Sequence, residues 1–204
     1  TAAPGSKGIR NFANYGFYYA NLSAWFTDDV VNIDGWRVPA AAFSEHTKNR
    51  RGIVAYGDVT NPALVPIAGS ATYSDPSLNQ SKVWAWYTPD GTKDSISIQG
   101  KTTVIADFVT RLVTVEIRNL VSFDPKPTDP ALPAAFTITI AMGNPGDNTA
   151  NYLTGAGQIT AAAQTLAGGM SARFFGPVGA GVTPVGGNGP AEIGGTFTFS
   201  STAG

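Results

Sequence analysis

Apolar and small polar residues alternate along much of the chain from residue 65 onward. This period of two is typical of a β-strand that buries one face and exposes the other. It is clearest in residues 113–118, 136–142 and 193–198, where branched or aromatic side chains alternate with Thr, Glu, Arg or Gly. We therefore predict a strand in each of these three segments.

Shorter segments with the same pattern raise the prediction to eight strands. They are residues 69–73, 81–87, 102–108, 157–163 and 170–175. The connections contain turn-forming residues, as in Pro89-Asp90-Gly91 and Asn144-Pro145-Gly146-Asp147. Short strands joined by such turns favour an all-β fold, an eight-stranded antiparallel up-and-down β-barrel, in which no sheet edge is left exposed.

The first part of the chain differs from the rest in its aromatic content. All 4 Trp residues lie within the first 87 residues. Residues 18–25 and 51–58 are predicted strands, and residues 39–45 a short helical turn. We expect residues 1–62 to form a smaller β-rich handle domain, packed on a barrel of residues 63–204.

The charge balance excludes several classes of partner. The chain has 13 Lys and Arg against 14 Asp and Glu, a net charge of −1, so no positive field would hold it on nucleic acid or an anionic membrane. No apolar run approaches the roughly 18 residues of a spanning helix, so we expect no membrane-spanning segment. The chain contains no Cys, which excludes disulfides and thiol chemistry.

The composition also bears on location. Only 13% of the residues are charged, and the chain holds 24 Gly. Such low charge, with many Thr and Ser, is typical of proteins outside a bacterial cell. Thr1-Ala2-Ala3-Pro4 has the character of a mature end left after signal-peptide cleavage.

Charged residues almost disappear near the C-terminus. After Asp147 only Arg173 and Glu192 are charged. Barrel strands with Ser and Thr on the solvent-exposed face would explain this lack of charge. A surface covered by a partner or by another copy of the chain would explain it as well.

Three motifs resemble one known family. The segments GGMSARFFGP at 168–177 and PAEIGGTF at 190–197 are similar to the closing hairpin of the transferrin-binding protein B β-barrel, and VPIAGSATY at 65–73 is similar to its first barrel strand. Two features depart from the family: residues 178–190 form an insertion, and the cysteine that anchors many members to lipid is missing. Either an anchor was removed or the chain resembles the released, haem-carrying hemophilins.

The resemblance implies a fold, a location and a class of function. It implies a barrel with a handle, located outside the cell or on the outer-membrane surface of a Gram-negative bacterium. Family members capture transferrin, haem or haemoglobin, complement factor H or heparin without covalent chemistry. On this basis we expect a haem- or iron-acquisition protein that hands its ligand to an outer-membrane receptor, or that binds a host protein.

The single histidine, His46, is the candidate haem ligand. Lys48, Arg50 and Arg51 follow it closely and suit the haem propionates. Haem pockets also have aromatic walls, and the same part of the chain contains Tyr18 and Tyr19. The alternative is a solvated loop with a surface histidine beside a basic cluster.

Other candidate sites carry less chemistry. Trp84 and Trp86 alternate on one predicted strand, where they belong either to the barrel core or to an exposed platform for a partner or a carbohydrate. A loose cation site could use Asp28, Asp29 and Asp34, although the spacing excludes an EF-hand. No nucleophile, zinc-protease or phosphate-loop motif appears, so we expect a protein that is not an enzyme.

A second class of function stays open. The uncharged C-terminal stretch and the Gly-, Ala- and Thr-rich composition also suit a structural or adhesive subunit of an extracellular assembly, in which copies of the chain associate.

Overall fold

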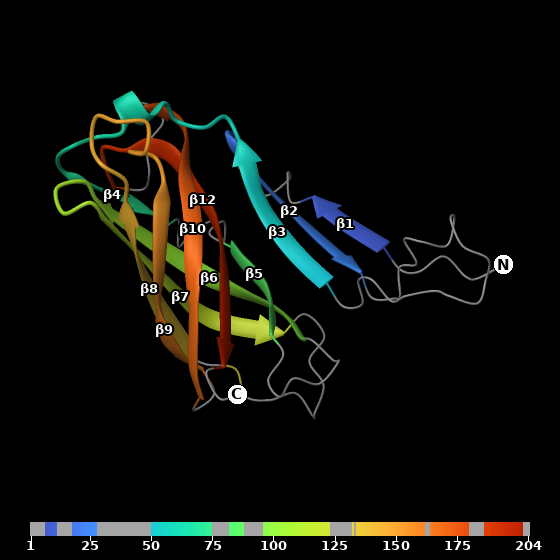
Figure 1. The fold of residues 1–204 in the computed structure, drawn as a ribbon. Coiled ribbons are helices and arrows are strands. Elements are labelled where there is room, and N and C mark those ends of the chain that lie inside the picture. Colours follow the sequence, from blue (N-terminus) through green and yellow to red (C-terminus); the bar gives the residue numbers. More distant parts are fainter. Residues whose placement is uncertain are drawn as a thin grey trace, which may run out of the picture.

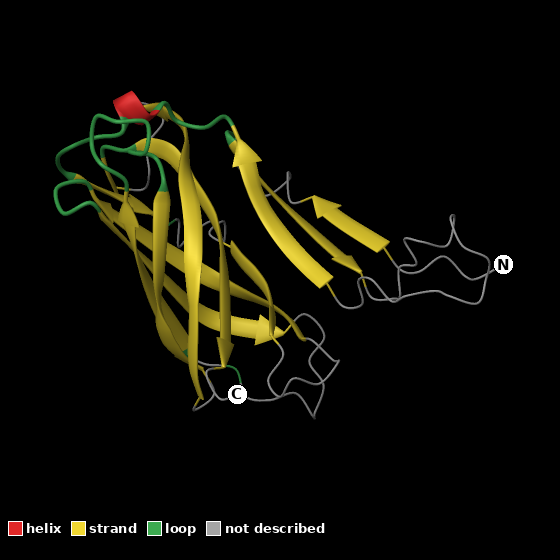
Figure 2. Ribbon diagram, viewed as in Figure 1, coloured by secondary structure: helices red, strands yellow, loops and turns green. Residues whose placement is uncertain are grey.

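A computed structural model describes residues 7–11, 18–27, 50–74, 82–87, 96–122, 132, 134–161, 164–179 and 186–201. These residues form two antiparallel β-sheets (Figure 1). Their only helical element is a short 3-10 turn, Pro62–Leu64 (Figure 2). No helix among the described residues is long and apolar enough to cross a membrane.

The small sheet comes from the N-terminal part of the chain. Its strands lie in the order β1-β2-β3. They are β1 (Lys7–Asn11), β2 (Ala20–Thr27) and β3 (Arg50–Gly57). The predictions for residues 18–25 and 51–58 are confirmed as strands, whereas β1 was not predicted. The turn predicted at residues 39–45 lies outside the described residues.

The large sheet contains the remaining strands. They are β4 (Ser70–Tyr73), β5 (Lys82–Tyr87), β6 (Ile96–Asp107), β7 (Leu112–Ser122), β8 (Ala135–Met142), β9 (Leu153–Ala161), β10 (Gln164–Val178), β11 (Gly186–Gly187) and β12 (Pro190–Ser201). Their order in the sheet is β11-β4-β6-β7-β8-β9-β10-β12, and β5 pairs with β6 beyond the end of β4. Each of the eight predicted strands has a counterpart here.

The prediction of a closed barrel is wrong. The antiparallel up-and-down order is present, but β12 pairs with no described strand other than β10, so the sheet is not closed. The inserted segment gives the reason. It contains β11, whose Gly186 and Gly187 pair with Thr72 and Ala71 on β4. This is the edge that the last strand would have to occupy to complete the ring.

Alternation decides which side chains form the core. On β7, Val113, Val115 and Ile117 are buried, while the residues between them are only half-buried. The same period buries Ile138 and Ile140 on β8, as their spacing predicts. Branched side chains in this arrangement pack efficiently on the pleated surface.

The core is sealed at one end and less covered at the other. Phe108, Phe174 and Leu153 lie at the end formed by the turns after β6 and β8, and all three are 0% exposed. Farther along β10 and β12, the side chains that face the core are only partly buried. They include Leu166, Met170, Phe197 and Phe199.

Candidate functional site

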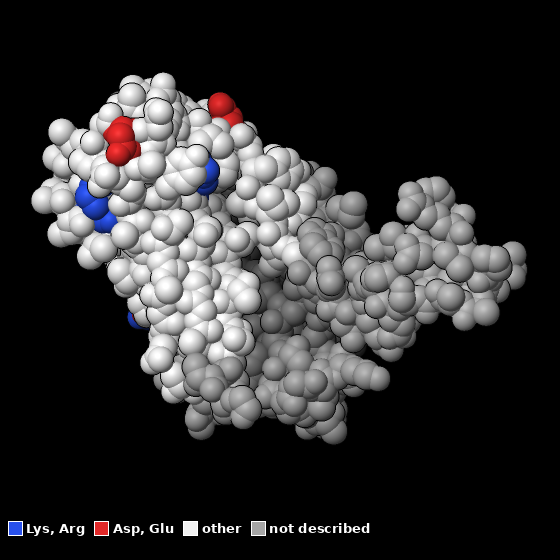
Figure 3. Space-filling view, viewed as in Figure 1, with Lys and Arg blue, Asp and Glu red and all other residues white. Residues whose placement is uncertain are grey.

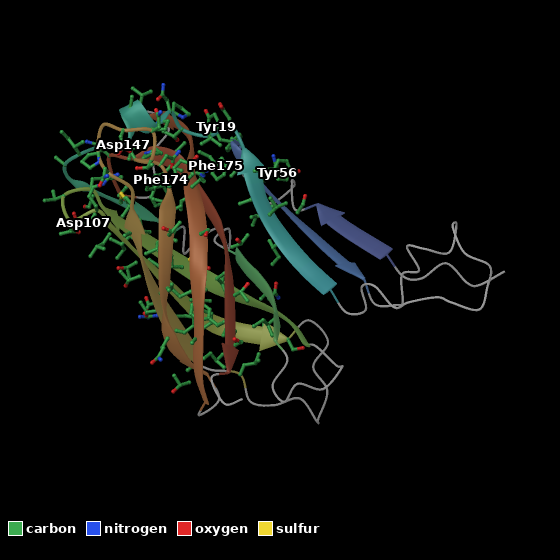
Figure 4. The ribbon with its side chains drawn as sticks, viewed as in Figure 1. Tyr19, Tyr56, Asp107, Asp147, Phe174 and Phe175 are labelled. Carbon is green, nitrogen blue, oxygen red and sulfur yellow. The ribbon has the colours of Figure 1, made fainter. Side chains whose placement is uncertain are left out.

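The small sheet joins the large sheet through contacts that we call the junction. It comprises Tyr18–Ala20, Asp58–Thr60, Phe174–Gly176 and Glu192. In Figure 4, Tyr19 and Phe175 lie where the small sheet meets the large one, and Tyr56 lies on β3. Two of the predicted site residues, Tyr18 and Tyr19, belong to this junction.

Glu192 binds the start of β2. Its Oε1 accepts a hydrogen bond from the backbone N–H of Tyr18 at 2.7 Å, and its Oε2 accepts from those of Tyr19 at 3.0 Å and Ala20 at 2.7 Å. Hydrogen bonds to an ionised acceptor are about twice as strong as neutral ones. One carboxylate therefore fixes the first residue of β2 and the two residues before it against β12.

A backbone ladder provides a second attachment. The segment after β3 runs beside the end of β10, with an antiparallel bridge between Val59 and Phe175. The N–H of Thr60 donates to the carbonyl of Phe174 at 3.0 Å, and that of Gly176 donates to the carbonyl of Asp58 at 2.7 Å. The small sheet is therefore tied to the large one by main-chain hydrogen bonds as well.

A buried asparagine completes this ladder. The Asn151 side chain is 0% exposed. Its Nδ2 donates to the carbonyls of Thr60 at 2.7 Å and Phe174 at 3.0 Å, and its Oδ1 accepts from the N–H of Phe174 at 2.7 Å. Every polar atom of the amide has a partner, which is what a buried amide requires.

Close packing leaves little space beside two glycines at the junction, and Gly176 is the more crowded of the two. Gly176 has φ +77, and a Cβ there would lie 2.6 Å from the Tyr19 ring. A Cβ on Gly194 would lie 3.2 Å from the Phe175 ring and 3.6 Å from the Cβ of Ala55. Phe175 is 1% exposed, so the small sheet covers a large aromatic side chain outside the main core.

Two tyrosines at or beside the junction are exposed. Tyr18 is 89% exposed although its backbone is held by Glu192. Tyr56 is 42% exposed, and its hydroxyl lies 3.5 Å from the Ser23 hydroxyl, which donates to it. Aromatic side chains on a fixed backbone lose little entropy when a partner covers them.

The other predicted haem-site residues are placed differently. Arg50 pairs with Thr27, whereas Gly57 pairs with Ala20. Arg50 and Arg51 are therefore at the opposite end of β3 from the tyrosines, about 20 Å away at the ordinary rise of a strand. His46 lies outside the described residues, so its place at a haem site stays a prediction.

The candidate tryptophan and aspartate side chains lie outside the described part of the structure. Trp84 and Trp86 lie on β5, but their side chains are outside the described part of the structure. Asp28, Asp29 and Asp34 are also outside it. Within the described residues, no group of three or more His, Asp or Glu could hold a metal ion.

The loops at the sealed end are held by Arg111. Its guanidinium donates to the carbonyl of Pro66 at 3.1 Å, to that of Gly143 at 2.6 Å and to that of Ala150 at 2.9 Å. Nearby, the Thr149 hydroxyl and backbone N–H hydrogen-bond to the carboxylate of Asp147 and hold its pKa below the usual range. Polar contacts therefore link these loops to one another.

A shallow groove lies on a different surface, across β9, β10 and β12. It measures about 430 Å³, and its lining contains no charged residue. Thr154, Ser171 and Thr196 form one row across the three strands, and Gly169 leaves space beside them. Figure 3 shows this face as white, with charged side chains gathered near the sealed end and at one side.

Glu192 and Asn151 were not identified from the sequence as the side chains whose hydrogen bonds hold the junction together. One signal was present for Glu192, because an isolated acidic residue in a nearly uncharged stretch needs a reason to be there. No comparable signal marked Asn151, because it follows directly after turn-forming residues and its sequence context is that of a turn.

Comparisons with known proteins add no identity. No protein-family model matches the chain, and no curated protein matches it. The similarity to the transferrin-binding protein B family therefore stays a prediction based on the three motifs.

Proposed function

We propose that this protein is a binding protein rather than an enzyme, secreted or displayed on the outer surface of a Gram-negative bacterium. It captures a ligand without covalent chemistry and passes it to an outer-membrane receptor. Haem or another iron source is the proposed ligand class. The observation that carries this proposal is the junction, which holds a small sheet with exposed tyrosines in a fixed position on a larger one.

The junction supports capture for a physical reason. Binding a ligand is costly when the binding surface must first be ordered. Here the backbone of Tyr18 is already fixed by Glu192, so its exposed ring can contact a ligand at little additional cost. A flat porphyrin is the kind of ligand that an exposed aromatic ring would suit, and His46 is its proposed axial ligand.

The test is a titration of the ligand-free protein with hemin, followed by absorbance. We expect the Soret band to shift and to reach saturation. His46→Ala should change the position of that band, because it removes the only imidazole. Absence of a shift, or a shift that is the same in His46→Ala, would contradict the haem proposal.

A pair of tyrosine variants tests the part played by the junction. Tyr18→Ala should weaken hemin binding by about tenfold, the effect of losing one well-placed contact. Tyr152→Ala is the matched control, because Tyr152 is also exposed, at 46%, but lies before β9 and stacks on Arg173. Equal effects of the two substitutions would argue against a site at the junction.

The uncharged face favours a second candidate function. Among the described residues after Asp147, only Arg173 and Glu192 are charged, and Figure 3 shows a broad white surface over these strands. Large contacts between subunits are depleted in charge. A structural or adhesive subunit would form particles larger than a dimer in sedimentation, and such particles would favour this function over capture.

A further inference from the structure

The last strand has an open edge. Among the described strands, β12 pairs only with β10. The small sheet meets β12 near Glu192 and Gly194, close to its beginning. From Gly195 to Ser201, the backbone groups on the other edge of β12 have no described strand beside them, and each N–H and C=O there can pair with another strand.

This edge lacks the features that normally prevent sheet-to-sheet association. Natural edge strands carry charges, prolines or bulges that block pairing. From Ile193 to Ser201 the chain has no charged residue and no proline. The register between β10 and β12 is also continuous from Glu192 to Ser201, since the only irregularity lies between Phe175 and Val178.

The core beside this edge is incompletely covered. Phe197 and Phe199 face the core but are only partly buried, and their ring centroids lie 6.2 Å apart. Phe197 also contacts Phe136, with centroids 6.0 Å apart. A further strand beside β12 would remove more of this aromatic surface from water, at about 25 cal/mol per Å².

The face of β12 that points away from the core would let another strand approach closely. Thr198 and Ser200 are exposed, small and uncharged, and they alternate with the two phenylalanines. In an antiparallel pair of two such strands about a two-fold axis, small residues meet small residues and aromatic residues meet aromatic residues. No like charges would face each other, so the sequence of β12 is complementary to itself.

We propose that two copies of this chain associate through β12, edge to edge and antiparallel, so that their large sheets become one continuous sheet. The occupant of the open edge is thus a second copy. The segment from Gly195 to Ser201 would supply the pairing, while Glu192 and Gly194 remain engaged with the small sheet. This association is independent of haem capture and of the residues in the junction.

Sedimentation velocity over a concentration series of roughly 1 to 100 µM tests the proposal, since mass action makes dimerisation concentration-dependent. We expect a reversible monomer–dimer equilibrium in the wild-type protein. Thr198→Lys places two like charges near the two-fold axis and should raise the dissociation constant by at least about tenfold.

Thr139→Lys is the matched control. Thr139 is also an exposed threonine on the large sheet, but it pairs with Thr114 and does not lie on the open edge. This variant should dimerise as the wild type does. A wild-type protein that stays monomeric throughout, or equal dimerisation by Thr198→Lys and wild type, would overturn the proposal.

Hydrogen exchange provides an independent measurement on the unmodified protein. Those amides of residues 195–201 that point away from β10 should become more protected as concentration rises, while the amides of β3 should not change. Protection that is independent of concentration would overturn the proposal even if Thr198→Lys failed to fold.

Discussion

The two ends of the large sheet differ in how completely they bury the same kinds of side chain. At the sealed end, Phe108 and Phe174 are 0% exposed and their ring centroids lie 5.9 Å apart. At the other end, Phe197 and Phe199 are only partly buried although they also face the core. Alternation aims all four inward, but only neighbouring chain segments can exclude water from them.

The sealed end is closed by segments that are distant in sequence. The stretch after β3 runs beside β10, and Gly189 packs so tightly that a Cβ there would lie 2.7 Å from the Cβ of Ala71. The other end has no such cover among the described residues. The alternation along the strands is similar at both ends of the sheet. Burial therefore depends on which other chain segments cover each end.

The largest expected effect separates these ends directly. Phe174→Ala should lower the free energy of unfolding by about 4 kcal/mol, because it leaves a cavity in a fully buried site. Phe199→Ala should cost less than about 2 kcal/mol, since the side chain is already partly in water. Urea unfolding measures both. Equal losses would show that the two ends are equally well packed.

Asn151→Ala should lower the free energy of unfolding by about 3 kcal/mol, because it leaves the N–H of Phe174 and the carbonyl of Thr60 without their partner. Asn148→Ala is the control, since Asn148 is exposed in the same loop and its loss should stay within about 0.5 kcal/mol. Chemical denaturation of both variants gives the difference. A loss below about 1 kcal/mol for Asn151→Ala would mean that water replaces the amide.

Gly176→Ala and Gly146→Ala distinguish crowding from backbone strain. Both glycines have positive φ, +77 and +82, but a Cβ at Gly146 would meet nothing within 4 Å. Gly146→Ala should cost about 1 kcal/mol from strain alone. Gly176→Ala should cost at least about 2 kcal/mol, because the new methyl group also displaces the Tyr19 ring. Thermal unfolding compares them, and equal costs would indicate that the Tyr19 ring moves freely.

The smallest effect is the pH dependence of the loops. The pKa of Asp147 is lowered in the folded protein by the Thr149 hydroxyl and N–H, so the unfolded chain binds a proton first as the pH falls. The stabilisation is present above roughly pH 4 and is lost as the pH falls through the folded pKa. The melting temperature of Asp147→Asn should be slightly below that of the wild type at neutral pH and equal to it in strong acid. A difference that persists in strong acid would contradict this origin.

Much of the fold was predictable because strand alternation is a local property. The periods at residues 113–118 and 136–142 identified β7 and β8 and the side chains that they bury. The strand predicted at residues 157–163 is observed as Leu153–Ala161, since glycines at its beginning hide the alternation. The site was less predictable, because Asn151 and Glu192 act on backbone atoms more than 20 residues away in sequence, whose positions no local pattern specifies.

Sequence determined the strands, their inward faces and the absence of charge along β12 after Glu192, since all of these depend on residue type and spacing. The tertiary structure decided whether the sheet closes. Strand pairing is a competition between segments for one edge, and β11 in the inserted segment occupies the edge of β4. That outcome leaves β12 open. The tertiary structure also brings Glu192 to the start of the small sheet, which alternation along the chain could not indicate.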